Sequence, residues 1–168
     1  MKTIILPGYS EHNRDWAEGI AEHLNLGHKA FVHEWRHWQE KSLSFSLRNE
    51  TEKILQEVGE DKINIIAKSV GVYVALNLIP KIALQINKVI LCGIASVVSE
   101  DRAELVKTLT SKIPLENILC IQNENDKFVP FAEAENFYHS VEPKLTVISM
   151  PRSDHNYPYS EDFRKFLF

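Results

Sequence analysis

A serine, an aspartate and a histidine occur along this chain in an order and in local settings suited to acyl transfer. Ser69 lies in the pentapeptide AKSVG (67–71), between an apolar run and a long apolar segment. A serine on a tight turn from a strand into a helix exposes its hydroxyl, and small residues two positions before and after it let the strand and the helix approach each other. Ala67 and Gly71 meet that need. The pattern predicts a nucleophile at Ser69, and the alternative is a hairpin in which SVGVYVAL is a second strand.

A nucleophilic serine needs a general base, and the base needs a carboxylate that holds its tautomer. Asp126, in NDKFVP, and His155, in SDHNYP, each follow an apolar run downstream of the serine. The order serine, aspartate, histidine is the one used by α/β architectures of this kind. The alternatives are that Asp126 caps the helix expected from residue 131, and that Glu124 or Asp154 is the acid.

Stabilising the oxyanion of such a reaction needs two backbone N–H donors, each worth about 3–4 kcal/mol in the transition state. The first donor is the N–H of Val70, which follows the serine. The second is expected from the LPGYS segment, where Gly8 lets the chain turn close to the site and the N–H of Tyr9 can face it. The alternative is an ordinary Pro-Gly turn.

Residues 33–38, HEWRHW, offer a competing chemistry. The pattern H-E-x-x-H on a helix places two histidines on one face to bind zinc, with the glutamate as general base. Glu57 follows His37 at the spacing of the third ligand in thermolysin-like proteases. However, KAFV leads directly into the motif and favours a strand, and EVGED after the glutamate lacks the rest of that pattern. We therefore favour a polar loop here over a zinc site.

The elements that must position these residues follow from alternating hydrophobic patterns. Short runs that are apolar at most positions are typical of strands buried on both faces, and longer amphipathic segments separate them. The expected strands are residues 3–6, 29–33, 63–67, 88–94, 117–122 and 145–150. The expected helices are residues 13–25, 45–58, 70–79 (ended by Pro80), 100–112, 131–141 and 160–168. Strand and helix in alternation predict an α/β/α sandwich with a mostly parallel six-stranded sheet, as a single domain over residues 1–168.

The charge and composition of the chain exclude several classes of binding partner. The net charge of −4 argues against a nucleic-acid binder, and no apolar run is long enough for a signal peptide or a membrane span. Cys92 and Cys120 lie in apolar runs and are expected to be buried, reduced thiols, as in a cytoplasmic protein. The first strand is not followed by G-x-G-x-x-G, so no nucleotide cofactor is expected, and no metal.

From LPGYS through AKSVG and NDKFVP to SDHNYP, the chain resembles the α/β-hydrolases. It is most similar to the small lidless serine hydrolases related to the retinoblastoma-binding-protein hydrolase and to minimal bacterial lipases. The resemblance implies a strand order of 2-1-3-4-5-6. It also implies Ser69 as nucleophile, His155 as base, Asp126 as its orienting acid, and Tyr9 and Val70 as oxyanion donors.

The sequence departs from many relatives at two positions beside the predicted site. Pro7 and Lys68 stand where a histidine is common, and both changes are expected to alter substrate preference rather than to remove a catalytic atom.

The predicted activity is hydrolysis of a small ester or thioester, and less readily of an amide. The segment between the fourth and fifth strands is hardly longer than one helix, so no lid is expected. Trp35 or Trp38, and Phe128, are candidate walls of the substrate pocket, unless the tryptophans pack on the helix expected at 45–58. The remaining alternative is a catalytically silent interaction module with this fold.

Overall fold

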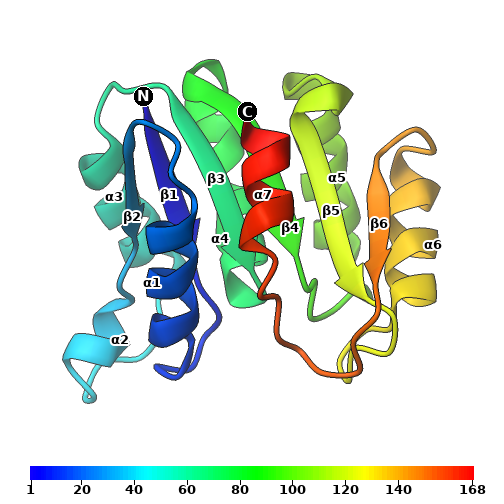
Figure 1. Ribbon diagram of the computed structural model, residues 1–168, viewed down its shortest axis with the longest axis horizontal. Helices are drawn as coiled ribbons and strands as arrows, with labels where there is room; N and C mark the ends of the chain where they lie inside the picture. Colours follow the sequence, from blue (N-terminus) through cyan, green and yellow to red (C-terminus); the bar gives the residue numbers. More distant parts are fainter.

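The computed structural model describes residues 1–168, apart from the side chain of Glu100. Its centre is a six-stranded sheet in the order β2-β1-β3-β4-β5-β6, and each neighbouring pair of strands is parallel (Figure 1). This confirms the α/β sandwich and the predicted strand order. The strands are β1 (Lys2–Leu6), β2 (Lys29–Val32), β3 (Ile63–Lys68), β4 (Ile86–Cys92), β5 (Ile118–Asn123) and β6 (Val147–Met150).

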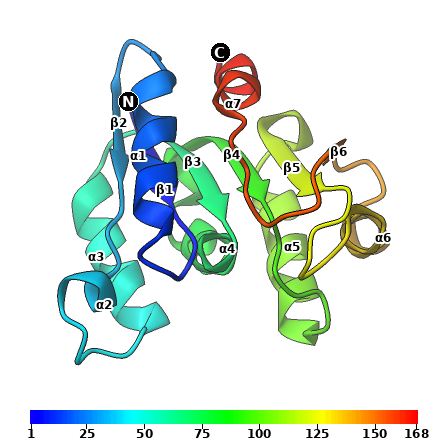
Figure 2. The same cartoon turned by 60° about the horizontal axis from the view of Figure 1, so that its bottom comes forward.

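Helices cover both faces of the sheet, as parallel strands buried on two sides require. Helices α1 and α7 lie on one face, and α3, α4, α5 and α6 lie on the other (Figures 1 and 2). Among the described residues, no helix is long and apolar enough to cross a membrane. The helices are α1 (Asn13–His23), α2 (Arg36–Gln39), α3 (Leu47–Val58), α4 (Val70–Ile82), α5 (Glu100–Lys112), α6 (Phe131–Val141) and α7 (Ser160–Leu167), with short 3₁₀ turns at Ala83–Gln85 and Leu115–Asn117.

The strands divide the core into two apolar layers because successive side chains point to opposite faces. In β1, Ile4 and Leu6 pack in the layer under α3 and α4, whereas Ile5 packs in the layer under α1 and α7. Every residue of β3 is buried. The two cysteines are free and buried as expected, and burial raises the pKa of the Cys92 thiol to about 12, so that it stays protonated.

Two local predictions were wrong. Helix α4 does not end at Pro80 but continues to Ile82, because Ile79 and Ile82 are buried in the core and the missing proline N–H affects only the last turn. Residues 33–38 are not a simple polar loop. They include the first three residues of the one-turn helix α2, and the side chains of His33, Trp35 and Trp38 are buried.

The contact between α4 and β1 has no room for a side chain. A Cβ atom placed on Gly71 would lie 2.1 Å from the carbonyl oxygen of Leu6. That distance is far below van der Waals contact, and the obstructing atom is backbone. Glycine at this position is therefore what allows α4 to start directly beside the end of β1. The sequence predicted a small residue here for the approach of the helix to the strand before Ser69, and the structure places the tightest contact at the neighbouring strand β1 instead.

We expect Gly71→Ala to lower the free energy of unfolding by about 3 kcal/mol or more, because overpacking against backbone cannot be relieved by a rotamer change. Urea denaturation followed by circular dichroism measures the loss. The matched control is Gly19→Ala in α1, where an added Cβ meets nothing within 4 Å. That change should be stabilising, by about 0.5–1 kcal/mol. Equal stability of Gly71→Ala and the unchanged protein would contradict the close approach.

Candidate active site

Ser69 lies where β3 turns into α4. Its backbone has φ 57° and ψ −118°, outside the regions that a non-glycine residue prefers, and such strain persists only where the surrounding structure imposes it. The Ser69 N–H donates to the carbonyl oxygen of Cys92 at the end of β4, at 3.2 Å. The side chain is half-buried at the carboxyl edge of the sheet. The structure thus places Ser69 on the strand-to-helix turn that the AKSVG pattern predicted.

His155 and Asp126 meet on the loops that follow β6 and β5. The His155 Nδ1 and the Asp126 Oδ2 are 2.6 Å apart, and both side chains are largely buried. Burial opposes ionisation of Asp126. Hydrogen bonds from His155, from Tyr157 and from the Phe128 N–H outweigh it, so the pKa of this carboxyl is lowered. An ionised acceptor at Nδ1 fixes the tautomer that leaves Nε2 able to take a proton.

Tyr157 is a part of this arrangement that we did not predict from the sequence. Its side chain is fully buried, and its hydroxyl donates to the Asp126 Oδ2 at 2.6 Å. The same hydroxyl accepts from the backbone N–H of Asn123, at 3.1 Å. Burial raises the pKa of this tyrosine, which therefore remains a donor. The sequence feature that could have indicated this role is an aromatic residue two positions after His155 in an otherwise polar segment.

Neither alternative acid bonds His155. The Asp154 carboxylate pairs with the guanidinium of Arg152, which lowers its pKa to about 2. Glu124 is exposed. Helix α6 has Pro130 at its N-cap, so Asp126 does not cap it, and its Oδ1 accepts instead from the Phe128 N–H at 2.9 Å. Of the three candidates, Asp126 is the carboxylate that bonds His155.

A pocket of about 450 Å³ brings the predicted residues together, with Tyr9, Ser69, Phe128 and His155 among its lining. The Phe128 ring contacts the His155 ring at a centroid distance of 4.7 Å, so Phe128 remains a candidate wall of the substrate pocket. The His155 Nε2 has no hydrogen-bond partner among the described residues. A bond between nucleophile and base often tightens only when substrate binds.

Two backbone amides are available beside Ser69. Within the described part of the chain, neither the Tyr9 N–H nor the Val70 N–H donates a hydrogen bond to another group. Val70 is the first residue of α4, where N–H groups have no intrahelical partner and the helix dipole favours negative charge. Both amides belong to segments that line or border the pocket, so they remain the candidate oxyanion donors.

The tryptophans of residues 33–38 do not line this pocket. Trp35 donates its indole N–H to the Gly8 carbonyl oxygen at 2.9 Å, and Trp38 donates to the Tyr9 carbonyl oxygen at 2.8 Å. Both are buried in the core layer that contains α3, which is the alternative considered above. Their contact with the site is indirect, since they hold the loop that carries the Tyr9 amide.

The histidines of the same segment do not share a helical face, because α2 begins at Arg36, after His33. The His33 ring is buried between two carboxylates, with Nδ1 2.6 Å from Glu57 and Nε2 2.9 Å from Glu50. His37 Nε2 lies 2.9 Å from the Tyr9 carbonyl oxygen. The H-E-x-x-H pattern therefore lacks the helical geometry of a zinc site here. The two imidazoles and Glu57 make hydrogen bonds that hold the fold instead.

The chain belongs to the serine hydrolase family, whose pattern matches residues 3–155. No curated protein matches its sequence significantly.

Solved structures share the fold at low sequence identity. A lidless α/β serine hydrolase from Xanthomonas campestris has a TM-score of 0.68 and 19% identity, over 99% of this chain and 78% of that one. An α/β serine hydrolase homologue from Coxiella burnetii has a TM-score of 0.76 and 19% identity, over 99% and 83%. An esterase from Exiguobacterium antarcticum has a TM-score of 0.71 and 14% identity, over 99% and 90%.

The His33 cluster predicts a pH dependence of stability. Burial disfavours the charged imidazole, but the hydrogen bonds to Glu50 and Glu57 outweigh it, so the pKa of His33 is raised above 6.5. A histidine whose pKa is raised by folding stabilises the folded state at pH values below its unfolded-state pKa. This stabilisation is lost as the pH rises through its folded-state pKa. Near pH 6, His33→Gln should lower the free energy of unfolding by about 3 kcal/mol. This loss of stability should be smaller at higher pH.

Denaturation curves between about pH 5 and pH 9 measure this difference. Glu57→Gln serves as the comparison, because removing one of the two carboxylates should move the decline to lower pH. A difference that stays constant across this range would mean that folding does not shift the pKa of His33, and a difference that grows with pH would mean that His33 is neutral in the folded protein.

Proposed function

We propose that this serine hydrolase cleaves small esters or thioesters through an acyl-enzyme on Ser69. The observation that carries the proposal is the His155–Asp126 pair, whose imidazole has a free Nε2 at the pocket that Ser69 also lines. A serine on a strained turn, a base and an orienting carboxylate are the three parts of a nucleophilic triad.

In the proposed reaction, the His155 Nε2 takes the Ser69 hydroxyl proton as the serine oxygen attacks the substrate carbonyl. The N–H groups of Tyr9 and Val70 donate to the resulting oxyanion. The imidazolium, stabilised by Asp126, then gives its proton to the departing alcohol or thiol. Water enters, loses a proton to the same nitrogen, and releases the acid by the reverse sequence.

The shape of the site favours small substrates. Between β4 and β5 the chain forms α5 and one 3₁₀ turn, and no described residue of that segment belongs to the pocket lining. An uncovered pocket of about 450 Å³ suits a compact acyl compound rather than a long lipid chain. The proposal includes a small acyl compound as the substrate and no nucleic-acid or membrane partner. It also includes a single domain and a cytoplasmic location.

Labelling with a fluorophosphonate tests the proposal directly, since the probe reacts with activated serines. Intact-mass spectrometry should show one adduct on the unchanged protein and none on Ser69→Ala, with both proteins folded by circular dichroism. His155→Ala should also fail to label, because the hydroxyl then lacks its base. The absence of any adduct on the unchanged protein would favour the interaction-module alternative.

The indole hydrogen bonds predict positioning roles for Trp35 and Trp38. Trp35→Phe keeps an aromatic ring but removes the donor to the Gly8 carbonyl, which loosens the loop that carries the Tyr9 amide. An oxyanion contact is made chiefly in the transition state, so kcat on a neutral aryl ester should fall about tenfold while KM changes little.

Phe45→Leu is the matched control, because this ring packs on Trp35 at a centroid distance of 5.5 Å without a polar contact to the loop. It should lower stability with a smaller effect on kcat. Equal losses of kcat in Phe45→Leu and Trp35→Phe would assign the effect to packing rather than to the hydrogen bond.

A further inference from the structure

Lys68, the residue before the predicted nucleophile, is a cation placed almost entirely inside the protein. It ends β3, and only 5% of its surface is exposed. Alternation along the strand points it to the sheet face covered by α1, where its ammonium lies 4.9 Å from the centroid of the Trp16 ring. Its one hydrogen bond among the described residues is to the Asn13 Oδ1, at 2.7 Å.

This environment leaves the ammonium without a salt-bridge partner, although the charges of Asp126 and Asp154 lie near enough to favour it. A lysine has three N–H donors, and an amide oxygen and a ring face do not neutralise its charge. Burying an unpaired charge is costly, and burial lowers the pKa of Lys68. No carboxylate of the described residues forms a salt bridge with it. Nearby Asp154 is paired with Arg152, and Asp126 is occupied by His155 and Tyr157.

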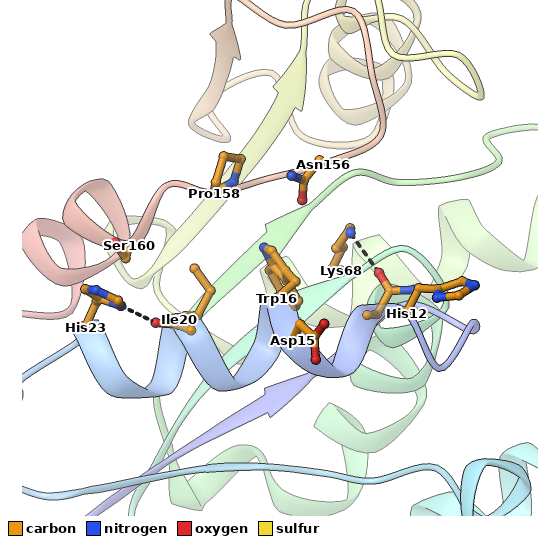
Figure 3. Close-up of a pocket in the computed structure, with 11 residues that line it drawn as sticks. His12, Asp15, Trp16, Ile20, His23, Lys68, Asn156, Pro158 and Ser160 are labelled. Atoms are coloured by element: carbon orange, nitrogen blue, oxygen red, sulfur yellow. Dashed lines mark hydrogen bonds between the residues drawn. The ribbon is translucent and has the colours of Figure 1, made fainter.

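Space for a ligand adjoins the ammonium on the same side. A cavity of about 660 Å³ lies between α1 and the segment 156–160, and its lining includes Trp16, Lys68 and Pro158. Figure 3 shows Lys68 and Trp16 pointing into this space, with Asn156 and Pro158 on its far side. Lys68, Asn13 and Asn156 also line the pocket of Ser69, so the two hollows share a wall.

We propose that Lys68 binds a carboxylate carried by the substrate, so that the enzyme prefers anionic esters. This inference rests on the proposed function and extends it to a substrate class. The unpaired ammonium supplies the charge, the shared wall brings it next to the scissile bond, and the larger cavity accepts the rest of the acid-bearing chain. A single ammonium matches a monoanion better than a doubly charged phosphate. Asp15, which also lines the larger cavity, is exposed to solvent.

Matched pairs of esters test the preference. On the acyl side, p-nitrophenyl hydrogen adipate is compared with its neutral methyl ester. On the alcohol side, para-acetoxybenzoate is compared with para-acetoxybenzamide. The readout is the ratio of kcat/KM for the anionic ester to that for its neutral partner, after subtraction of the uncatalysed rate. A charge-assisted hydrogen bond should give a ratio of about ten or more in one pair, and that pair identifies which side of the substrate Lys68 holds.

Three variants assign the ratio to Lys68. Lys68→Met, which removes the charge at similar length, should bring the ratio close to one, and Lys68→Arg should preserve a preference for the anion. Lys127→Met is the matched control, because Lys127 is an exposed lysine on the Ser69 pocket and its loss changes the net charge equally. The ratio should survive that change. A ratio near one in the unchanged protein, or one that Lys68→Met leaves intact, would overturn the proposal.

Two further measurements separate this inference from the proposed function. Fluorophosphonate labelling of each variant reports whether Ser69 is activated, whatever the charge of the substrate. Calorimetric titration of Ser69→Ala with monomethyl adipate, a monoanion, reports anion binding without turnover, and this binding should disappear when Lys68→Met is added. Labelled Ser69 with no charge preference and no binding of monomethyl adipate would refute only the Lys68 site. Absence of labelling together with binding of monomethyl adipate that is lost on Lys68→Met would refute the hydrolase and retain the site.

Discussion

The turn between β3 and α4 is the constraint on which the site depends. Gly71 lets the helix start against the carbonyl of Leu6, and that approach forces Ser69 into a backbone conformation that a serine would not otherwise adopt. The strain is offset by packing, since α4 is the most apolar helix of the fold and is buried along much of its length. One contact therefore sets the direction of the Ser69 side chain, the start of a helix with free N–H groups, and the position of Lys68 one residue earlier.

Around this turn, the remaining parts are held by hydrogen bonds of side chains from several loops. Asp126 is fixed by the Phe128 amide and by Tyr157, whose hydroxyl is in turn anchored on Asn123. The loop that contains Tyr9 is fixed by two indole donors from the segment after β2. That segment is tied to α3 through His33. A buried ion pair remote from the nucleophile thus supports a loop at the site.

The α/β sandwich could be predicted from the sequence, because buried parallel strands leave strong local patterns, and the strand order followed from the resemblance to the α/β-hydrolases. The AKSVG and SDHNYP patterns indicated Ser69 and His155 as candidate site residues, and both line one pocket. The roles of Tyr157, Trp35 and Trp38 could not be predicted from the sequence. Each depends on which backbone carbonyl or carboxylate lies beside an aromatic side chain in space, and a single sequence contains no information on that pairing. The continuation of α4 past Pro80 was missed for a related reason, since tertiary burial of Ile82 outweighs local propensity.

His155 follows β6, a four-residue strand at the edge of the sheet, where no residue is fully buried and hydrogen-bonded pairing is to β5 alone. Ser69 instead follows β3, in the middle of the sheet, where every residue is buried. The two halves of the site therefore belong to regions of unequal local stability. We therefore expect the last strand to fray before the central sheet opens, which would separate the imidazole from the serine. Hydrolytic activity would then be lost on heating before the bulk of the fold melts.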